Sequence, residues 1–114
     1  MPKSLGEFEQ LILFAALRLG DEAYGASIRR EIEEQTGRPV TAGSVYTVLD
    51  RLESRGLVAS FTGEPTPQRG GRRKKYYRIQ RKGAELLHHT YQAQQRMASG
   101  VTGRLEELLN DPTA

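Results

Sequence analysis

The chemistry that this sequence suggests most directly is the binding of phosphate groups by a run of basic residues. Residues 69–82 hold eight lysines and arginines and no acidic residue, although the 114-residue chain has a net charge of only +3. The remainder of the chain holds nine basic residues against all 14 acidic ones. A basic surface on an otherwise acidic body is typical of proteins that bind a polyanion. The alternative is a solvated loop whose charges serve only to keep the protein in solution.

The basic run begins in a segment, residues 63–74, that is rich in glycine, proline and arginine and has neither helical nor strand periodicity. Glycines allow the backbone to approach a ligand closely, and arginines suit phosphates or a narrow minor groove. Phosphate contacts supply affinity and little sequence information. The residues expected to contact DNA here are Arg69, Gly71, Arg72, Arg73 and Lys74.

A second candidate surface is a predicted helix over residues 42–55, with Thr41 as its N-cap and Gly56 just beyond its end. Its apolar residues recur at helical spacing: Val45, Val48, Leu49 and Leu52. The opposite side carries hydroxyl groups, small residues and an arginine, which can contact base edges and phosphates in a major groove. The expected DNA contacts are Thr41, Gly43, Ser44, Tyr46, Thr47 and Arg51. The alternative is that these are ordinary exposed polar residues.

No residue pattern indicates catalysis, a cofactor or a metal site. The sequence has no cysteine, and its two histidines, His88 and His89, are neighbours on a predicted helix and point about 100° apart. The carboxylates fall on helix faces that we expect to be solvated. We therefore expect a protein that is not an enzyme and that binds no cofactor.

Length and composition favour one compact domain without a membrane span. Apolar residues make up 37% of the chain, and no apolar run approaches the ~18 residues of a membrane-spanning helix. The residues that follow Met1 lack the apolar core of a signal peptide, so we expect a cytoplasmic protein.

Periodicity places these surfaces on a series of short elements. Apolar spacing predicts helices over residues 5–19 and 24–36 before the helix at 42–55. The first is predicted to begin with a capping box between Ser4 and Glu7. Strands are predicted over residues 57–62 and 75–79. A last helix of ~30 residues is predicted from Gln80 to about Asn110, although Gly100 weakens it.

This order predicts a mainly α (α+β) fold, a winged helix-turn-helix domain with a two-stranded wing and a long C-terminal dimerisation helix. The expected division is a DNA-binding domain at residues 1–80 and a dimerisation helix with its tail at residues 81–114. The last helix is too long to fold back onto a small domain, so its apolar residues require a second chain. We therefore expect a homodimer.

Three stretches of the sequence resemble the PadR family of bacterial transcriptional regulators. They are Leu11 to Ile28 with its Tyr-Gly-Ala-Ser-Ile end, Gly43 to Glu53 followed by Gly56-Leu57-Val58, and Gly70 to Ile79 followed by Lys82-Gly83. The resemblance implies a cytoplasmic repressor that binds pseudo-palindromic operators as a homodimer and is released by a small aromatic or drug-like effector. It has two departures, because Thr47 stands where the family often has proline, and this chain has no tryptophan for an effector to stack on.

Two further hypotheses concern partners other than DNA. An effector site at the dimer interface is predicted to be lined by Phe8, Phe14, Tyr91 and Met97. The alternative is that these four side chains only form the apolar core of the dimer interface. The alternative function is a winged-helix module for protein–protein interaction without operator binding. Exposed acids on the helix predicted at residues 42–55, such as Asp50 and Glu53, would favour that module.

Overall fold

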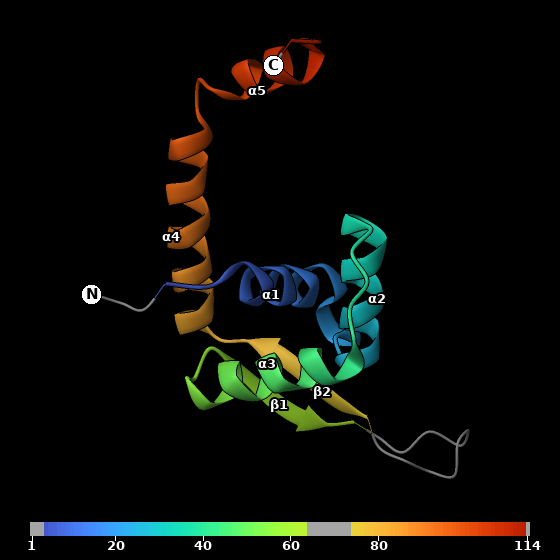
Figure 1. Cartoon of the computed structure of the whole chain (residues 1–114). Coiled ribbons are helices and arrows are strands. Elements are labelled where there is room, and N and C mark those ends of the chain that lie inside the picture. Colours follow the sequence, from blue (N-terminus) through green and yellow to red (C-terminus); the bar gives the residue numbers. More distant parts are fainter. Residues whose placement is uncertain (1–3, 64–73, 114) are drawn as a thin grey trace.

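The computed structural model describes residues 4–63 and 74–113, and it is mostly helical with one antiparallel sheet (Figure 1). Three helices come first and the two strands follow them. Two further helices lead away from this body, and the molecule measures 59 × 35 × 20 Å. The elements are α1 (Glu7–Leu19), η1 (Gly20–Glu22), α2 (Gly25–Thr36), α3 (Ala42–Ser54), β1 (Val58–Thr62), β2 (Lys75–Ile79), α4 (Arg81–Ala98) and α5 (Thr102–Asn110).

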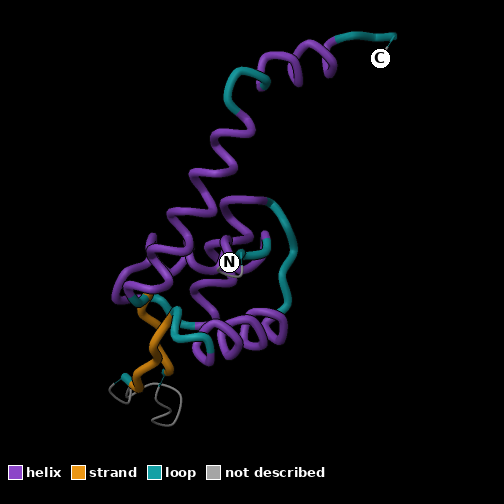
Figure 2. The backbone as a smooth tube through the Cα atoms, turned by 90° about the vertical axis from the view of Figure 1, so that its left-hand side faces the viewer, coloured by secondary structure: helices purple, strands orange, loops and turns teal. Residues whose placement is uncertain are grey.

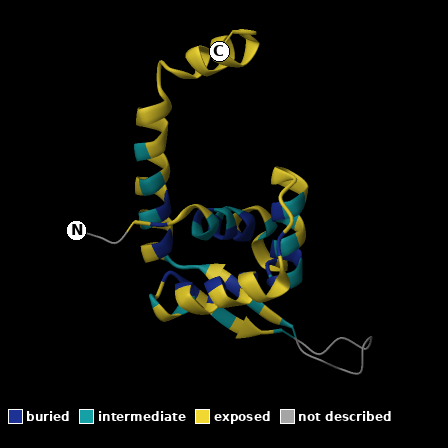
Figure 3. Cartoon of the chain, in the orientation of Figure 1, coloured by how far each residue is buried: buried dark blue, intermediate teal, exposed yellow. Residues whose placement is uncertain are grey.

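The core lies where α1, α2, α3 and the sheet meet, and α1 runs through its centre (Figure 3). Ile12 and Leu13 of α1 have no exposed surface, and neither have Ile28 of α2 and Leu49 of α3. Each fully buried leucine or isoleucine contributes about 1.5–3 kcal/mol through removal of its apolar surface from water. The helical spacing of the apolar residues therefore identified the sides of α2 and α3 that face the core.

The first helix begins two residues later than predicted, and the predicted capping box between Ser4 and Glu7 is wrong. Gly6 is the N-cap, and its N–H donates to Glu9 Oε1 at 2.9 Å. Leu5 is buried, with 5% of its surface exposed. Because Leu5 packs into the core, the helix begins after it and Glu9 becomes the acceptor in the first turn.

The N-terminus of α3 is capped as predicted. The Thr41 hydroxyl oxygen accepts the N–H of Ser44 at 3.2 Å, and the Ser44 hydroxyl donates to the Thr41 carbonyl at 2.8 Å. At the other end Gly56 has φ +75°, a left-handed conformation that glycine adopts without strain. Both ends of α3 are therefore specified by residues next to it in the sequence.

Replacing Thr41 with alanine is expected to lower the free energy of unfolding by about 1 kcal/mol, because the Ser44 N–H loses its acceptor. Thr41→Ser keeps the hydroxyl oxygen and should retain most of that stability. The midpoint of urea unfolding at one fixed protein concentration measures the difference. A Thr41→Ala midpoint equal to that of the unchanged protein would contradict this role.

The two strands form the antiparallel hairpin that the sequence predicts, with Ser60 opposite Tyr77 and Phe61 opposite Tyr76. Tyr77 is buried on the inner side of the hairpin, where α1 and α3 pack. The Tyr77 N–H donates to the Ala23 carbonyl at 2.9 Å, and Tyr24 forms an isolated bridge with Tyr76. The residues just before α2 therefore extend the edge of the sheet, which the sequence pattern did not indicate.

The prediction of a single C-terminal helix is wrong, because the helical conformation is interrupted at residues 99–101. Ser99 leaves the helical conformation with ψ 126°, and Gly100 follows with φ +82°. The two shorter helices, α4 and α5, point in different directions away from the body (Figure 2). No residue of α5 is buried. None of the described helices is long and apolar enough to cross a membrane.

Candidate nucleic-acid interface

The side of α3 that faces away from the core carries all six of the residues that the sequence assigned to it. Thr41, Gly43, Ser44, Tyr46, Thr47 and Arg51 are all exposed. Val45, Val48, Leu49 and Leu52 are buried beneath them. The chain thus presents hydroxyls, a glycine and a guanidinium together on one convex helical surface, a combination suited to base edges and phosphates.

Tyr46 lies across the angle between α2 and α3. A Cβ atom placed on Gly25 would come within 2.4 Å of the Tyr46 ring. The absence of a side chain at Gly25 therefore allows the ring to pack on the start of α2, while 45% of Tyr46 remains exposed. The aromatic ring therefore contributes to the packing of α2 against α3 and is also accessible to a ligand.

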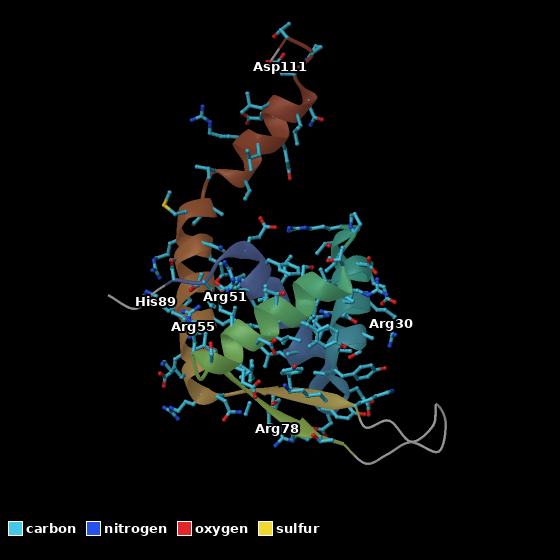
Figure 4. All side chains as sticks on the ribbon, turned by 60° about the horizontal axis from the view of Figure 1, so that its bottom comes forward. Arg30, Arg51, Arg55, Arg78, His89 and Asp111 are labelled. Atoms are coloured by element: carbon cyan, nitrogen blue, oxygen red, sulfur yellow. The ribbon has the colours of Figure 1, made fainter. Side chains whose placement is uncertain are left out.

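Arg51 and Arg55, near the end of α3, share one carboxylate from α1. Glu9 Oε2 lies 3.4 Å from Arg51 Nε and 3.2 Å from Arg55 Nη1. The Glu9 side chain is only 12% exposed, whereas that of Arg51 is 52% exposed. Both arginines lie toward α4, and Arg30 lies on α2 at the other side of the body (Figure 4). The sequence did not indicate that Arg51 has an acidic partner.

Five residues of the glycine- and arginine-rich segment 63–74 were predicted to contact DNA. Four of them lie outside the described residues, namely Arg69, Gly71, Arg72 and Arg73. The fifth, Lys74, is at the base of the loop, where its carbonyl accepts the Gly63 N–H at 2.9 Å. Its ammonium group lies 4.3 Å from the centre of the Tyr24 ring. Lys74 is therefore held at the end of the hairpin, against the start of α2.

A cluster of aromatic rings at the base of this loop was not predicted as part of the site. The Tyr24 and Tyr76 rings meet edge to face at 5.6 Å, and Phe61 stacks on Tyr76 at the same distance. The Arg30 guanidinium donates to the Tyr24 hydroxyl oxygen at 3.2 Å and lowers the pKa of that phenol, and Lys74 lowers it further. The cluster ties the hairpin to α2. The aromatic residues at 75–79 had signalled a strand but not this packing.

Glu53 of α3 is engaged with the hairpin. Its carboxylate accepts a short hydrogen bond from the Ser60 hydroxyl and lies 3.6 Å from Lys75 Nζ. The Ser60 hydrogen bond is the main reason that the pKa of Glu53 lies below its usual value, and Lys75 adds to it. Glu53 is therefore a structural contact between α3 and the sheet, so of the two acids that would favour a protein-binding surface only Asp50 is exposed.

The four residues predicted to line an effector site do not lie together in one chain. Phe14 of α1 and Tyr91 of α4 meet edge to face, with 5.5 Å between ring centres. Phe8 instead packs beneath the guanidinium of Arg38, and Met97 is 82% exposed. Met97 lines an open hollow of about 630 Å³ between the N-terminal segment and α4. Within the described part of the chain, no group of three or more histidines and acids is placed to hold a metal ion.

Comparison with known proteins agrees with this geometry. The model of the transcriptional regulator PadR-like family matches residues 13–89. A crystal structure of a PadR family transcription regulator from Clostridium difficile has 27% identity and a TM-score of 0.67, covering 88% of this chain and 98% of that one. A PadR family transcriptional regulator from Eggerthella lenta has 29% identity and a TM-score of 0.65, covering 88% and 87%.

The fold also occurs in a more distant protein. F93 from STIV, a winged-helix DNA-binding protein, has 16% identity and a TM-score of 0.67, covering 86% of this chain and 98% of that one. No curated protein matches the chain in sequence. The architecture is that of a winged helix, in which α3 takes the position of the recognition helix and the β1–β2 hairpin that of the wing.

Proposed function

The chain belongs to the PadR-like family of transcriptional regulators, and on this premise we propose that it represses transcription in the cytoplasm by binding a pseudo-palindromic operator as a homodimer. The observation that carries the proposal is the exposed side of α3, which presents the hydroxyls of Thr41, Ser44 and Thr47 and the guanidinium of Arg51. A small protein that occupies an operator blocks access to the DNA without needing a separate activation surface.

We assign base contacts to the recognition helix and phosphate contacts to the wing. Ser44, Tyr46 and Thr47 are the candidates for base edges, since hydroxyls donate and accept and the Tyr46 ring can pack on a thymine methyl group. Thr41, Gly43 and Arg51 are the candidates for nearby phosphates. In the wing, the candidates for phosphate or the minor groove are Arg69, Gly71, Arg72, Arg73 and Lys74.

The proposed division is a DNA-binding unit at residues 1–80 and a dimerisation unit at residues 81–114. Support comes from apolar side chains that remain exposed on the C-terminal helices, namely Tyr91, Met97, Val101, Leu105, Leu108 and Leu109. Burial of such side chains against a second copy would stabilise a symmetric dimer. Two recognition helices would then enter major grooves about 34 Å apart.

An effector would act by favouring one arrangement of the two units over another. The edge-to-face pair of Phe14 and Tyr91 joins α1 of the DNA-binding unit to α4 of the dimerisation unit. A small aromatic or drug-like molecule that binds beside this pair, with Met97 or Phe8 supplied across the dimer, could shift that arrangement. The usual scale of such coupling is about 1–3 kcal/mol.

Fluorescence anisotropy tests the proposed function. The purified protein is titrated onto the duplex from upstream of its own coding sequence and onto a scrambled duplex, at two salt concentrations. Tight, saturable binding to the native duplex that weakens steeply with salt is expected, with much weaker binding to the scrambled one. Equal and feeble binding to both duplexes would contradict an autoregulatory operator and favour a wing that serves a protein partner.

The same titration tests the wing. Arg72→Ala is expected to make the slope of log affinity against log salt shallower by about 0.9, the value for one lost phosphate contact. Arg18→Ala removes the same charge from an arginine that pairs with Glu31 on another part of the body, so it serves as the control. An unchanged slope for Arg72→Ala would remove Arg72 from the interface.

A further inference from the structure

Glu9 of α1 forms ion pairs with two arginines at the C-terminal end of the recognition helix α3. It accepts the Gly6 N–H through Oε1, and its Oε2 lies within 3.4 Å of both Arg51 and Arg55. The hydrogen bond to Oε1 orients the carboxylate at the first turn of α1, and Oε2 faces the two arginines of α3. Arg55 also approaches from the same helix, with 21% of its side chain exposed.

The pair between Glu9 and Arg51 links a nearly buried acid to an exposed base. Glu9 is 12% exposed and Arg51 is 52% exposed. Arg51 therefore remains accessible to a phosphate group, while the acid beneath it is held by α1. A phosphate that approaches Arg51 would compete with the Glu9 carboxylate for the same guanidinium and would be repelled by its negative charge.

We propose that Glu9 is a positioning residue that limits DNA affinity, because its carboxylate competes with a DNA phosphate for the Arg51 guanidinium. This inference rests on the proposed function and extends it to a residue outside the recognition helix and the wing. It makes α1, through one carboxylate, part of the electrostatic balance of the DNA-binding surface.

The sign of a single substitution separates this role from a purely structural one. If Glu9 merely supported the position of α3, its loss would misplace the helix and weaken DNA binding. If Glu9 competes with DNA, its loss tightens binding and steepens the dependence on salt, since Arg51 then meets DNA without an internal partner. Glutamine suits this test because it keeps the size of the side chain and an oxygen for the Gly6 N–H.

The experiment compares Glu9→Gln, Arg51→Gln and the double variant by anisotropy on the native and scrambled duplexes over a series of salt concentrations. Glu9→Gln is expected to bind both duplexes about fivefold more tightly at low salt, the scale of one partly exposed ion pair. Arg51→Gln is expected to bind more weakly, and in its background Glu9→Gln should have little effect. Such a double-mutant cycle isolates the coupling between the two residues.

Glu31→Gln is the matched control. Glu31 is also a helical glutamate with a side chain 17% exposed, and its partner is an arginine of a different helix, Arg18 at 2.9 Å. It does not contact α3 through that pair, so its substitution should leave affinity and salt slope nearly unchanged. A rise equal to that of Glu9→Gln would mean that net charge alone was responsible, which would overturn the proposal.

Further outcomes would also decide the matter. Weaker or unchanged binding by folded Glu9→Gln would overturn the inference, as would a gain that persists without Arg51. If thermal melting shows that Glu9→Gln does not fold, Glu9→Asp is tested in its place, since aspartate keeps the charge but withdraws it by one methylene. Glu9→Asp is expected to give a smaller gain in DNA affinity, and no gain in affinity would overturn the proposal. If the unchanged protein binds neither duplex, the proposed function itself fails, whereas the inference alone fails when that protein binds and Glu9→Gln resembles it.

Discussion

Replacing Leu105 and Leu108 of α5 with glutamate is expected to convert the proposed dimer to a monomer and to weaken operator binding by roughly 10²-fold. The two side chains are 59% and 58% exposed, and with Val101 they follow the four- and three-residue spacing of one helix face. A carboxylate forced into an apolar interface loses its hydration without gaining a partner, so association becomes unfavourable.

The large effect on DNA binding follows from the loss of the second recognition helix. In a dimer, binding of one half-site makes binding of the other an intramolecular event, and linked sites of this kind gain about 10²–10⁴ in affinity. A monomer would retain the contacts of a single half-site only. The scrambled duplex should therefore be affected less than the native one.

Sedimentation or light scattering measures the mass, and anisotropy on the native duplex measures the affinity. The control is Leu105→Met with Leu108→Met, which keeps apolar side chains of similar volume and should preserve both properties. A glutamate variant that keeps the mass of a dimer would show that α5 does not form the interface. A monomer with undiminished operator affinity would show that one copy suffices.

Replacing Gly83 with alanine is expected to lower the free energy of unfolding by about 3 kcal/mol, because the added methyl group has no space. A Cβ at this position would lie 2.2 Å from the Leu57 carbonyl oxygen and 3.1 Å from Cγ1 of Ile79. The nearest atom belongs to the backbone, so a change of side-chain rotamer cannot relieve the clash.

The same carbonyl also has a hydrogen bond to lose. Leu57 O accepts the Gln80 N–H at 2.9 Å, immediately before α4 begins. If the carbonyl or α4 moves to make room, this bond lengthens and the junction between the hairpin and α4 opens. Buried backbone groups that lose their partners cost free energy comparable to the lost bond.

Chemical unfolding at one fixed protein concentration measures the effect of Gly83→Ala. Gly103→Ala is the matched control, because Gly103 also lies in a helix and a Cβ there would meet no atom within 4 Å. The control is expected to be neutral or to gain up to about 1 kcal/mol from helix propensity. Equal unfolding midpoints for Gly83→Ala and the unchanged protein would contradict the close packing of α4 on Leu57.

The sequence alone determined the type and order of the elements in the DNA-binding body. The helical spacing of Val45, Val48, Leu49 and Leu52 identified the buried side of α3, and thereby the side that faces outward. The cap at Thr41 and the strand at residues 75–79 were predicted as observed. These features depend on interactions within a few residues of one another, which a sequence pattern records directly.

The C-terminal region marks the limit of such patterns. A glycine such as Gly100 weakens a helix by only about 1 kcal/mol. Packing around the helix decides whether that cost interrupts it. The sequence thus indicated a weak point and predicted continuity, whereas the chain breaks there and forms α4 and α5. The predicted start of α1 was wrong for a similar reason, because burial of Leu5 decided where the helix begins.

Only the tertiary structure decided which groups meet across the fold. Glu9 lies 42 and 46 residues from the two arginines that it pairs with, and Tyr24 lies 52 residues before its bridge partner Tyr76. Gly83 is close to Leu57 because α4 crosses the start of the hairpin. Periodicity shows which side of a helix is apolar, but the distance between two charged or aromatic groups depends on how the helices and strands pack, and that packing is set by the whole core at once.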